Sequence, residues 1–205
     1  MEKRILFVLL EEYADWEGAY LASEIMRSSN EESNNYCVKT VSLIKEPVHS
    51  IGGFTTLPDY AIDSVDNHFN GLILIGGNSW RKESSKKVIP LIKKALENNA
   101  VLGAICDATV FLGMNGFLNE GKHTSNQLEE LKKAAGKNYS GEKEYINQQA
   151  VRDGNRITAN GTAALEFSKE VLVALGIKNK AEADDWYHFH KLGYCKYMKQ
   201  LNNIG

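Results

Sequence analysis

Cys106 stands where a protein could hold a nucleophile at a strand-to-helix turn. It ends the apolar run VLGAIC, and a short helical pattern, ATVFLGMNG, begins two residues later. Ala104 and Ala108, two positions before and after it, are small, as the sharp turn of a nucleophile elbow requires, and such a turn strains the nucleophile's backbone. The N-terminus of the following helix would favour the thiolate. The pattern predicts a cysteine nucleophile; the alternative is a buried structural thiol, the usual state of a lone cysteine.

Two further stretches follow apolar runs in the same way. Gly76 and Gly77, with Asn78, come directly after LILI, and the glycines would let their backbone N–H groups approach a ligand closely. Together with the N–H of Asp107 they could form an oxyanion hole. The stretch EEYADWEG follows the first apolar run, and one of its carboxylates could hydrogen-bond the thiol. The alternatives are structural: a Gly-Gly turn, and carboxylates that complement a helix dipole.

The elements that must position these residues alternate along the chain. Short apolar runs predict buried strands, and periodic segments predict helices, here with Asp15 as an N-cap, Pro90 in a first turn and Gly176 as a stop. Strands are expected at 4–10, 36–44, 71–75, 101–106 and 156–159, and helices at 15–27, 88–99, 108–116 and 162–176. This order predicts an α/β fold: a three-layer sandwich of a mostly parallel sheet with helices on both faces. Chemistry would gather at the carboxyl ends of its strands.

The composition is that of an ordinary globular protein. The chain has 205 residues, 43% of them hydrophobic, which suits one domain with a small appendage. Its net charge of −2 gives no basic excess for nucleic acid or an anionic membrane, and the cluster RKESSKK is interpreted as a solvated helix face. The first apolar run is interpreted as a strand rather than a signal peptide, and no run approaches the ~18 residues that span a bilayer. A cytoplasmic protein is therefore expected.

The order of the motifs resembles that of the ThiJ/PfpI superfamily. KRILFVLLEEYADWEGA, GLILIGGN, LGAICDAT, HTSN and ITANGTAALEFSKEVL occur in the superfamily's order and spacing, over about residues 3 to 176. The superfamily includes Parkinsonism-associated deglycase-like proteins and bacterial intracellular-protease-like proteins. The resemblance implies a class I glutamine amidotransferase-like, flavodoxin-like fold for residues 1–180. The aromatic, amphipathic segment 181–205 is expected to pack on that domain as a C-terminal helical extension.

The resemblance also assigns roles to residues of the predicted site. The superfamily's reactive cysteine corresponds to Cys106, and its helix-borne glutamate, which hydrogen-bonds the sulfur, corresponds to Glu17. The backbone oxyanion donors correspond to Gly77, to Gly76 and to Asp107 behind the cysteine. The resemblance thus implies that a proton can pass between the Cys106 thiol and the Glu17 carboxyl.

Both superfamily histidines are missing from their places. The protease-like branch has a histidine directly after the cysteine, where this chain has Asp107. The deglycase-like branch has one twenty residues past the cysteine, where this chain has Asn126. Glu17 is therefore the expected proton shuttle, and Asp107 is either a second acid–base group or a charge that raises the pKa of Cys106.

The remaining histidines do not indicate a catalytic or metal site. His123 lies three residues before Asn126 and is expected to be structural. His188 and His190 would share a face of a strand but not of a helix, and no acidic or cysteine partner stands at metal spacing. Neither a metal nor another cofactor is expected.

These observations predict a cysteine-dependent hydrolase-like protein, either a protease or amidase or a hydrolase or hydratase of small electrophiles. Its partner would be a small-molecule or peptide substrate, and relatives in the superfamily imply a homodimer. Two alternatives remain open. One is a redox or electrophile-stress sensor that acts through oxidation of Cys106. The other is a non-catalytic binding module that retains the elbow only as an inherited shape.

Overall fold

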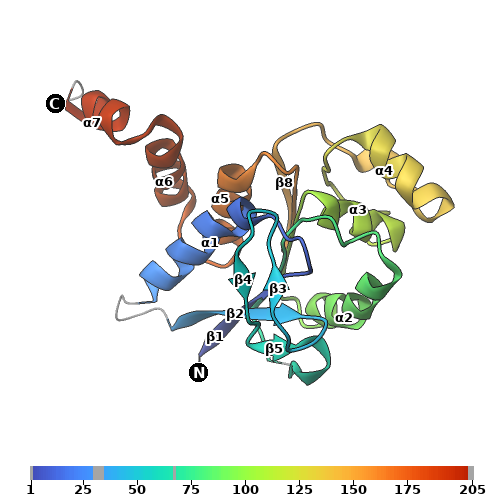
Figure 1. The fold of residues 1–205 in the computed structure, drawn as a ribbon. Helices are drawn as coiled ribbons and strands as arrows, with labels where there is room; N and C mark the ends of the chain where they lie inside the picture. Colours follow the sequence, from blue (N-terminus) through green and yellow to red (C-terminus); the bar gives the residue numbers. More distant parts are fainter. Residues whose placement is uncertain (1, 30–34, 67, 203–205) are drawn as a thin grey trace.

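The centre of the protein is a seven-stranded sheet, seen in a computed structural model that describes residues 2–29, 35–66 and 68–202 (Figure 1). The strand order is β5-β2-β1-β6-β7-β9-β8, and all neighbours pair in parallel except β8 and β9. The strands are β1 (Lys3–Val8), β2 (Tyr36–Ser42), β5 (Tyr60–Ala61), β6 (Gly71–Leu74), β7 (Val101–Ile105), β8 (Ala150–Asp153) and β9 (Arg156–Ala159). A small antiparallel hairpin joins β3 (Val48–His49) to β4 (Thr55–Thr56).

Helices cover both faces of this sheet. α1 (Asp15–Ser28) and α5 (Ala164–Ala174) pack on one face, and α2 (Ile89–Glu97), α3 (Asp107–Met114) and α4 (Leu128–Ala135) lie on the other. α6 (Lys180–Leu192) packs on α5, and α7 (Tyr194–Asn202) extends from it away from the sheet (Figure 1). Short 3-10 turns span Ile62–Ser64, Glu83–Val88, Gly136–Asn138 and Glu142–Glu144.

Strand side chains alternate between two separate hydrophobic cores. In β1, Leu6 and Val8 join the core beneath α2, α3 and α4, while Ile5 and Phe7 join the core beneath α1 and α5. The strands β6 and β7 alternate in the same way, so their continuous apolar runs are explained by burial on both faces. The predicted three-layer α/β sandwich is confirmed.

The long apolar elements occur where the sequence predicts them, with ends that differ by a few residues. Pro90 lies in the first turn of α2, and Gly176, with φ of +70°, follows the end of α5. The expected N-cap is wrong: Ala14 occupies that position, and Asp15 instead accepts a hydrogen bond from Gly52 N–H at 2.9 Å. The prediction also missed α4, β8 and the two-residue strands.

The C-terminal segment is helical, as expected, and consists of α6 and α7. Within α6, Ala183 and Trp186 are buried against the body of the protein, whereas α7 has no buried residue. Residues 203–205 of the predicted extension lie outside the described residues. The division of the chain near residue 180 stays a prediction. None of the helices in the described ranges has both the length and the apolar character that crossing a bilayer requires.

Candidate active site

Three neighbouring strands deliver the predicted residues to one cavity of about 350 Å³. Because β1, β6 and β7 are adjacent and parallel, the segments after their carboxyl ends meet at the same edge of the sheet. The cavity is lined by Ala14, Trp16, Glu17, Ile51, Gly77, Asn78, Arg81, Cys106, Asp107 and Asn126. Every predicted site residue except Gly76 therefore lines one cavity, and Gly76 lies directly behind it.

The turn at Cys106 has the strained backbone of a nucleophile elbow. Its φ of 59° and ψ of −131° fall outside the regions that non-glycine residues normally occupy. Neighbouring groups hold this conformation: the N–H of Cys106 donates to the carbonyl of Ala159 at 3.0 Å, and the hydroxyl of Thr109 donates to the carbonyl of Cys106 at 2.6 Å. Backbone strain maintained by several contacts is typical of functional residues. The predicted elbow is confirmed as a backbone geometry.

Glu17 lies at the buried side of the cavity, fully enclosed. Its Oε2 accepts a hydrogen bond from Gly76 N–H at 2.8 Å. Its Oε1 is buried and has no hydrogen-bond partner among the described residues. Burial raises the pKa of Glu17 to about 7, although the Gly76 N–H works in the opposite direction. The carboxyl is therefore poised to gain or lose a proton near neutral pH.

The thiol of Cys106 lies beside this carboxyl and is partly buried. A Cβ built on Gly161 would lie 2.8 Å from the sulfur and 3.3 Å from Glu17 Oε1, so both atoms face the same glycine. Burial, together with the charge of Glu17, raises the pKa of Cys106 to about 11. The backbone N–H of Asp107 lowers that pKa, as the helix argument predicted, but burial outweighs it. With its pKa raised in this way, Cys106 favours the thiol at neutral pH.

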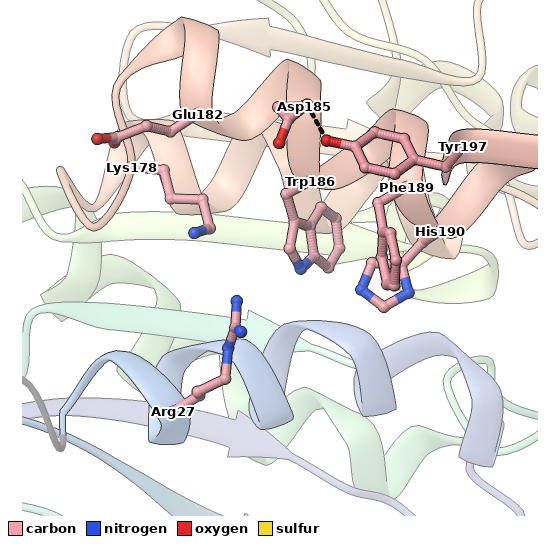
Figure 2. A pocket seen from close by; sticks show the side chains of 8 residues that line it. All are labelled: Arg27, Lys178, Glu182, Asp185, Trp186, Phe189, His190 and Tyr197. Atoms are coloured by element: carbon pink, nitrogen blue, oxygen red, sulfur yellow. Dashed lines mark hydrogen bonds between the residues drawn. The ribbon is translucent and has the colours of Figure 1, made fainter. Parts of the chain in front are cut away.

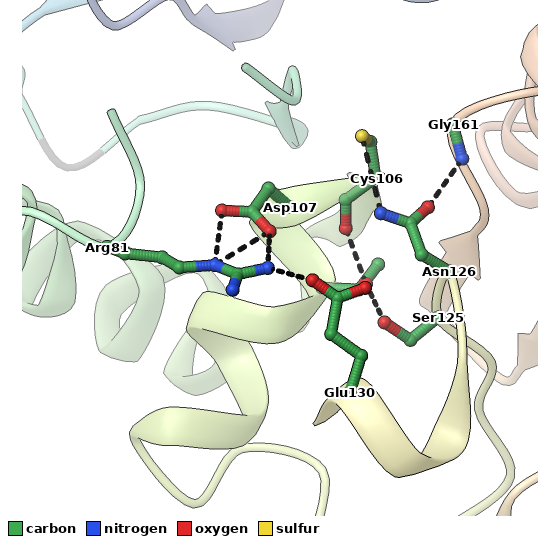
Figure 3. A network of polar contacts seen from close by, with 8 residues as sticks. Arg81, Cys106, Asp107, Ser125, Asn126, Glu130 and Gly161 are labelled. Atoms are coloured by element: carbon green, nitrogen blue, oxygen red, sulfur yellow. Dashed lines mark hydrogen bonds and ion pairs between the residues drawn. The ribbon is translucent and has the colours of Figure 1, made fainter. Parts of the chain in front are cut away.

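Asn126 occupies the place of a missing histidine and contacts the sulfur directly (Figure 3). Its Nδ2 donates to Cys106 Sγ at 3.5 Å, and its Oδ1 accepts from Gly161 N–H at 2.9 Å. The second bond fixes the orientation of the amide, so that its donor points at the sulfur. An amide donor stabilises a thiolate but cannot accept the thiol proton, so Asn126 does not replace a histidine as a base.

Of the predicted oxyanion donors after β6, two have N–H groups that are already hydrogen-bonded and one does not. Gly76 N–H is already bonded to Glu17, and Asn78 N–H donates to the carbonyl of Glu12 at 3.1 Å, so neither is available to a ligand. Gly76 N–H thus holds the Glu17 carboxyl rather than facing the cavity as a free donor. Gly77 has a φ of +147°, and a Cβ there would lie 2.3 Å from the carbonyl of Glu12, so only glycine fits. In the part of the chain that the structure describes, Gly77 N–H has no acceptor.

Asp107 is engaged by a residue that the sequence analysis misassigned. Arg81 Nε lies 3.0 Å from each carboxylate oxygen of Asp107, and its Nη2 lies 2.5 Å from Asp107 Oδ1 and from Glu130 Oε1 (Figure 3). Arg81 belongs to the cluster RKESSKK, which was interpreted as a solvated face. The chain folds this arginine back over the elbow, and no local sequence pattern indicates that contact.

Two apolar side chains complete the cavity opposite the charged groups. Trp16 lies in the first turn of α1 and its Nε1 donates to the carbonyl of Gly161 at 3.3 Å, while half of its surface remains exposed. Ile51 reaches the cavity from the β3–β4 hairpin, whose tip is bonded to the carbonyl of Tyr13. The sequence analysis assigned neither to the site: the hairpin strands around Ile51 are only two residues long, and Trp16 lies within the EEYADWEG stretch, where only the carboxylates were considered.

The histidines lie outside this cavity. His123 is buried, with Nε2 2.7 Å from the hydroxyl of Tyr139 and Nδ1 2.9 Å from the carbonyl of Gly121, which confirms the structural interpretation. His188 and His190 lie on the helix α6. In the described ranges, no three His, Cys, Asp or Glu side chains are grouped as a metal site requires.

A second cavity of about 550 Å³ lies between α1 and the C-terminal helices (Figure 2). Its walls carry Arg27, Lys178, Glu182, Asp185, Trp186, Phe189, His190 and Tyr197. The two cations face the buried Glu24, to which both are paired, and the hydroxyl of Tyr197 donates to Asp185. No cysteine lines this cavity, so the chemistry is assigned to the cavity around Cys106.

Comparison with known proteins places the chain in a family. The family model described as "DJ-1/PfpI family" matches residues 3–174. The chain is 38% identical over 202 residues to "Uncharacterized protease YdeA" of Bacillus subtilis, covering 98% of each chain. It is 32% identical over 204 residues to "Uncharacterized protease YoaZ" of the same organism, covering 98% of this chain and 97% of that one.

Solved structures agree with this assignment. A thiJ/pfpI family protein from Bacillus anthracis is 34% identical, with a TM-score of 0.88 over 99% of this chain and 97% of that one. The DJ-1 superfamily protein Atu0886 from Agrobacterium tumefaciens is 31% identical, with a TM-score of 0.79 over 93% of this chain and 100% of that one. The family model, the relatives and the fold all agree: the chain belongs to the DJ-1/PfpI family.

Proposed function

We propose that this protein is a cysteine-dependent hydrolase-type enzyme that acts on small carbonyl electrophiles or peptides, with Cys106 as nucleophile and Glu17 as proton acceptor. One observation carries the proposal: a fully buried carboxyl with a pKa of about 7 lies beside a strained, partly buried thiol. A general base is most effective when its pKa lies near the working pH. Glu17 therefore takes the role that a histidine has in other cysteine hydrolases.

The first step joins the substrate to sulfur. As Cys106 Sγ attacks the carbonyl carbon of an amide or ester, the thiol proton moves to the Glu17 carboxylate, and the carbonyl π electrons move to oxygen. The N–H groups of Gly77 and Asp107 stabilise that oxyanion. Transfer of a proton within a thiol–carboxylate pair suits a buried site, because the pair carries one negative charge before and after the transfer.

The second step releases the first product and regenerates the enzyme. When the oxyanion collapses, the bond to the leaving amine or alcohol breaks and Glu17 returns its proton to that group, which leaves a thioester on Cys106. Water then attacks the thioester while Glu17 accepts its proton. The carbon–sulfur bond breaks, the acid product leaves, and the proton returns to sulfur.

The cavity limits the substrate to a small group. A volume of about 350 Å³ is at the lower end of ligand pockets, and the apolar faces of Trp16 and Ile51 would receive an uncharged side chain or ring. The printed names of two relatives include the word protease, which supports peptide or amide substrates.

A pH–rate profile tests this proposal. Hydrolysis of a panel of p-nitrophenyl esters, anilides and short peptides should disappear in Cys106→Ser, and kcat/KM should rise with pH through about 7 as Glu17 ionises. Glu17→Gln should lower kcat/KM by about 100-fold or more and remove the inflection near pH 7. If Glu17→Gln kept the inflection, another group would be the base.

The redox sensor is less well supported. Oxidation to sulfenic acid proceeds through a thiolate, whereas burial and Glu17 raise the pKa of Cys106 to about 11. A nucleophile needs its thiolate only in the transition state, where Glu17 can take the proton. Mass spectrometry after mild peroxide separates the two functions: preferential oxidation of Cys106 over Cys37 and Cys195 at neutral pH would favour the sensor.

A further inference from the structure

Arg81 contacts the elbow but takes no part in the proposed proton transfers. It lies just beyond the loop that carries Gly77, and it reaches both oxygens of Asp107, the residue directly after the nucleophile. A second carboxylate, Glu130 from α4, holds the same guanidinium at 2.5 Å. Two carboxylates from different helices therefore fix one cation at the rim of the cavity (Figure 3).

The direction of the Asp107 side chain matters for the sulfur. Figure 3 shows its carboxylate turned toward Arg81, while the sulfur of Cys106 is contacted on the other side by Asn126. The Asp107 side chain is only 15% exposed, so water screens its charge poorly, and a bidentate guanidinium is the partner that best compensates it. The negative charge of Asp107 already contributes to the raised pKa of Glu17, so it acts across the cavity.

The charged groups around the thiol come from four elements. Glu17 faces it from α1, Asp107 from the start of α3, Arg81 from the segment after β6, and Glu130 from α4 through Arg81. This set holds three carboxyl groups and one cation. A thiolate that forms during attack would meet an uncompensated charge on Asp107 if the guanidinium were absent.

We propose that Arg81 is a positioning residue that compensates the charge of Asp107 and keeps its carboxylate turned away from Cys106, so that the thiolate can form. The proposal rests on the proposed function, since it assumes that Cys106 must ionise. It assigns different effects to the two partners of Arg81. Asp107 follows Cys106 in the chain and lines the same cavity, so its charge lies near the sulfur, whereas Glu130 contacts the guanidinium of Arg81 from α4.

Alkylation of Cys106 against pH tests this without any substrate. The full-length protein is treated with iodoacetamide at pH 7, 8 and 9, below the raised pKa of Cys106, and the rate of Cys106 adduct formation is measured by peptide mass spectrometry. Arg81→Gln should raise the pKa of Cys106 and so slow alkylation about 3- to 10-fold at each pH. Arg81→Lys keeps the positive charge but not the bidentate contact to Asp107, and it should recover part of the alkylation rate. Because Arg81 is a half-exposed side chain, these variants should fold, and circular dichroism checks it.

Two further variants separate a charge effect from a structural one. Asp107→Asn should speed alkylation, and adding Arg81→Gln to it should then change the rate less than 2-fold, because no charge remains to compensate. Glu130→Gln is the matched control: it removes the other carboxylate from Arg81 and should not slow alkylation. An equal slowing by Arg81→Gln with and without Asp107→Asn, or no slowing at all, would overturn the proposal.

The outcomes distinguish this inference from the proposed function. If alkylation shifts as expected while Cys106→Ser retains hydrolysis, the role of Arg81 stands and the cysteine mechanism is wrong. If Cys106→Ser abolishes hydrolysis but Arg81→Gln leaves the alkylation rate of Cys106 unchanged, the mechanism stands and the role of Arg81 is wrong.

Discussion

The carboxyl of Glu17 and the thiol side chain of Cys106 pack against the same two glycines. A Cβ on Gly76 would lie 2.5 Å from both Glu17 Oε2 and Cys106 Cβ, and one on Gly161 would lie close to Glu17 Oε1 and the sulfur. The two functional groups can lie this close because Gly76 and Gly161 have no side chains that would separate them. Burial raises both pKa values, and the nearby charge of Glu17 raises that of Cys106 further.

Replacing Glu17 by glutamine should make stability less dependent on pH. The pKa of Glu17 rises from 4.5 to about 7 on folding, so the folded state binds its proton more tightly. Its contribution is fully present below pH 4.5 and is lost as the pH rises through about 7. Between pH 4 and 9 the free energy of unfolding of Glu17→Gln should therefore improve relative to wild type by about 3 kcal/mol. Urea denaturation at several pH values measures this, and a constant difference would contradict the burial of a titrating carboxyl.

Replacing Asn126 by alanine should make Cys106 less reactive. The variant loses the amide donor at 3.5 Å from the sulfur, which favours the thiolate. Alkylation of Cys106 at pH 8 should slow by about 10-fold, the lower end of what one hydrogen bond to a charged acceptor contributes. Exposed Cys195 in the same sample is the internal control, and its rate should not change. Faster alkylation would mean that Asn126 restricts access rather than stabilising charge.

Replacing Gly161 by alanine should block the thiol sterically. The added methyl group would lie 2.8 Å from the sulfur, closer than two such atoms can pack, so the thiol must move or be covered. Alkylation of Cys106 should slow about 10-fold or more, while overpacking costs about 1–3 kcal/mol of stability. Thermal unfolding and alkylation rates measure the two effects. Unchanged alkylation of a folded variant would contradict the packing of Gly161 against the sulfur.

Two aromatic residues of the C-terminal segment should differ sharply in their effect on stability. Trp186 is 6% exposed and belongs to the core beneath α1 and α5, whereas Tyr194 is 66% exposed on α7. Trp186→Ala should lower the free energy of unfolding by about 3–5 kcal/mol, and Tyr194→Ala by less than about 1. Similar effects from the two substitutions, measured by chemical denaturation, would show that α6 does not contribute to the core as described.

Most of the sheet and part of the site could be predicted from the sequence because their signals are local. Continuous apolar runs reveal strands buried on both faces, and Ala104 and Ala108 around Cys106 reveal a turn that tolerates only small neighbours. The two-residue strands, α4 and β8 were missed. Two residues are too few for a periodicity, whereas α4 was overlooked: it is short, but Leu131 and Ala135 have the spacing of one helix face and both are buried.

The sequence by itself indicated the elbow and the glycines after β6, since each is specified by residue types within a few positions, while the choice of Glu17 among the carboxylates of EEYADWEG came from the resemblance to the superfamily. Only the tertiary structure decided that Glu17 accepts its hydrogen bond from Gly76 N–H and that the Asn126 amide donates to the sulfur. It also decided that Arg81 pairs with Asp107. These contacts join residues 20 to 59 positions apart, and no short-range pattern encodes them. The pKa values of Glu17 and Cys106 were decided in the same way, because desolvation depends on everything that packs around a group.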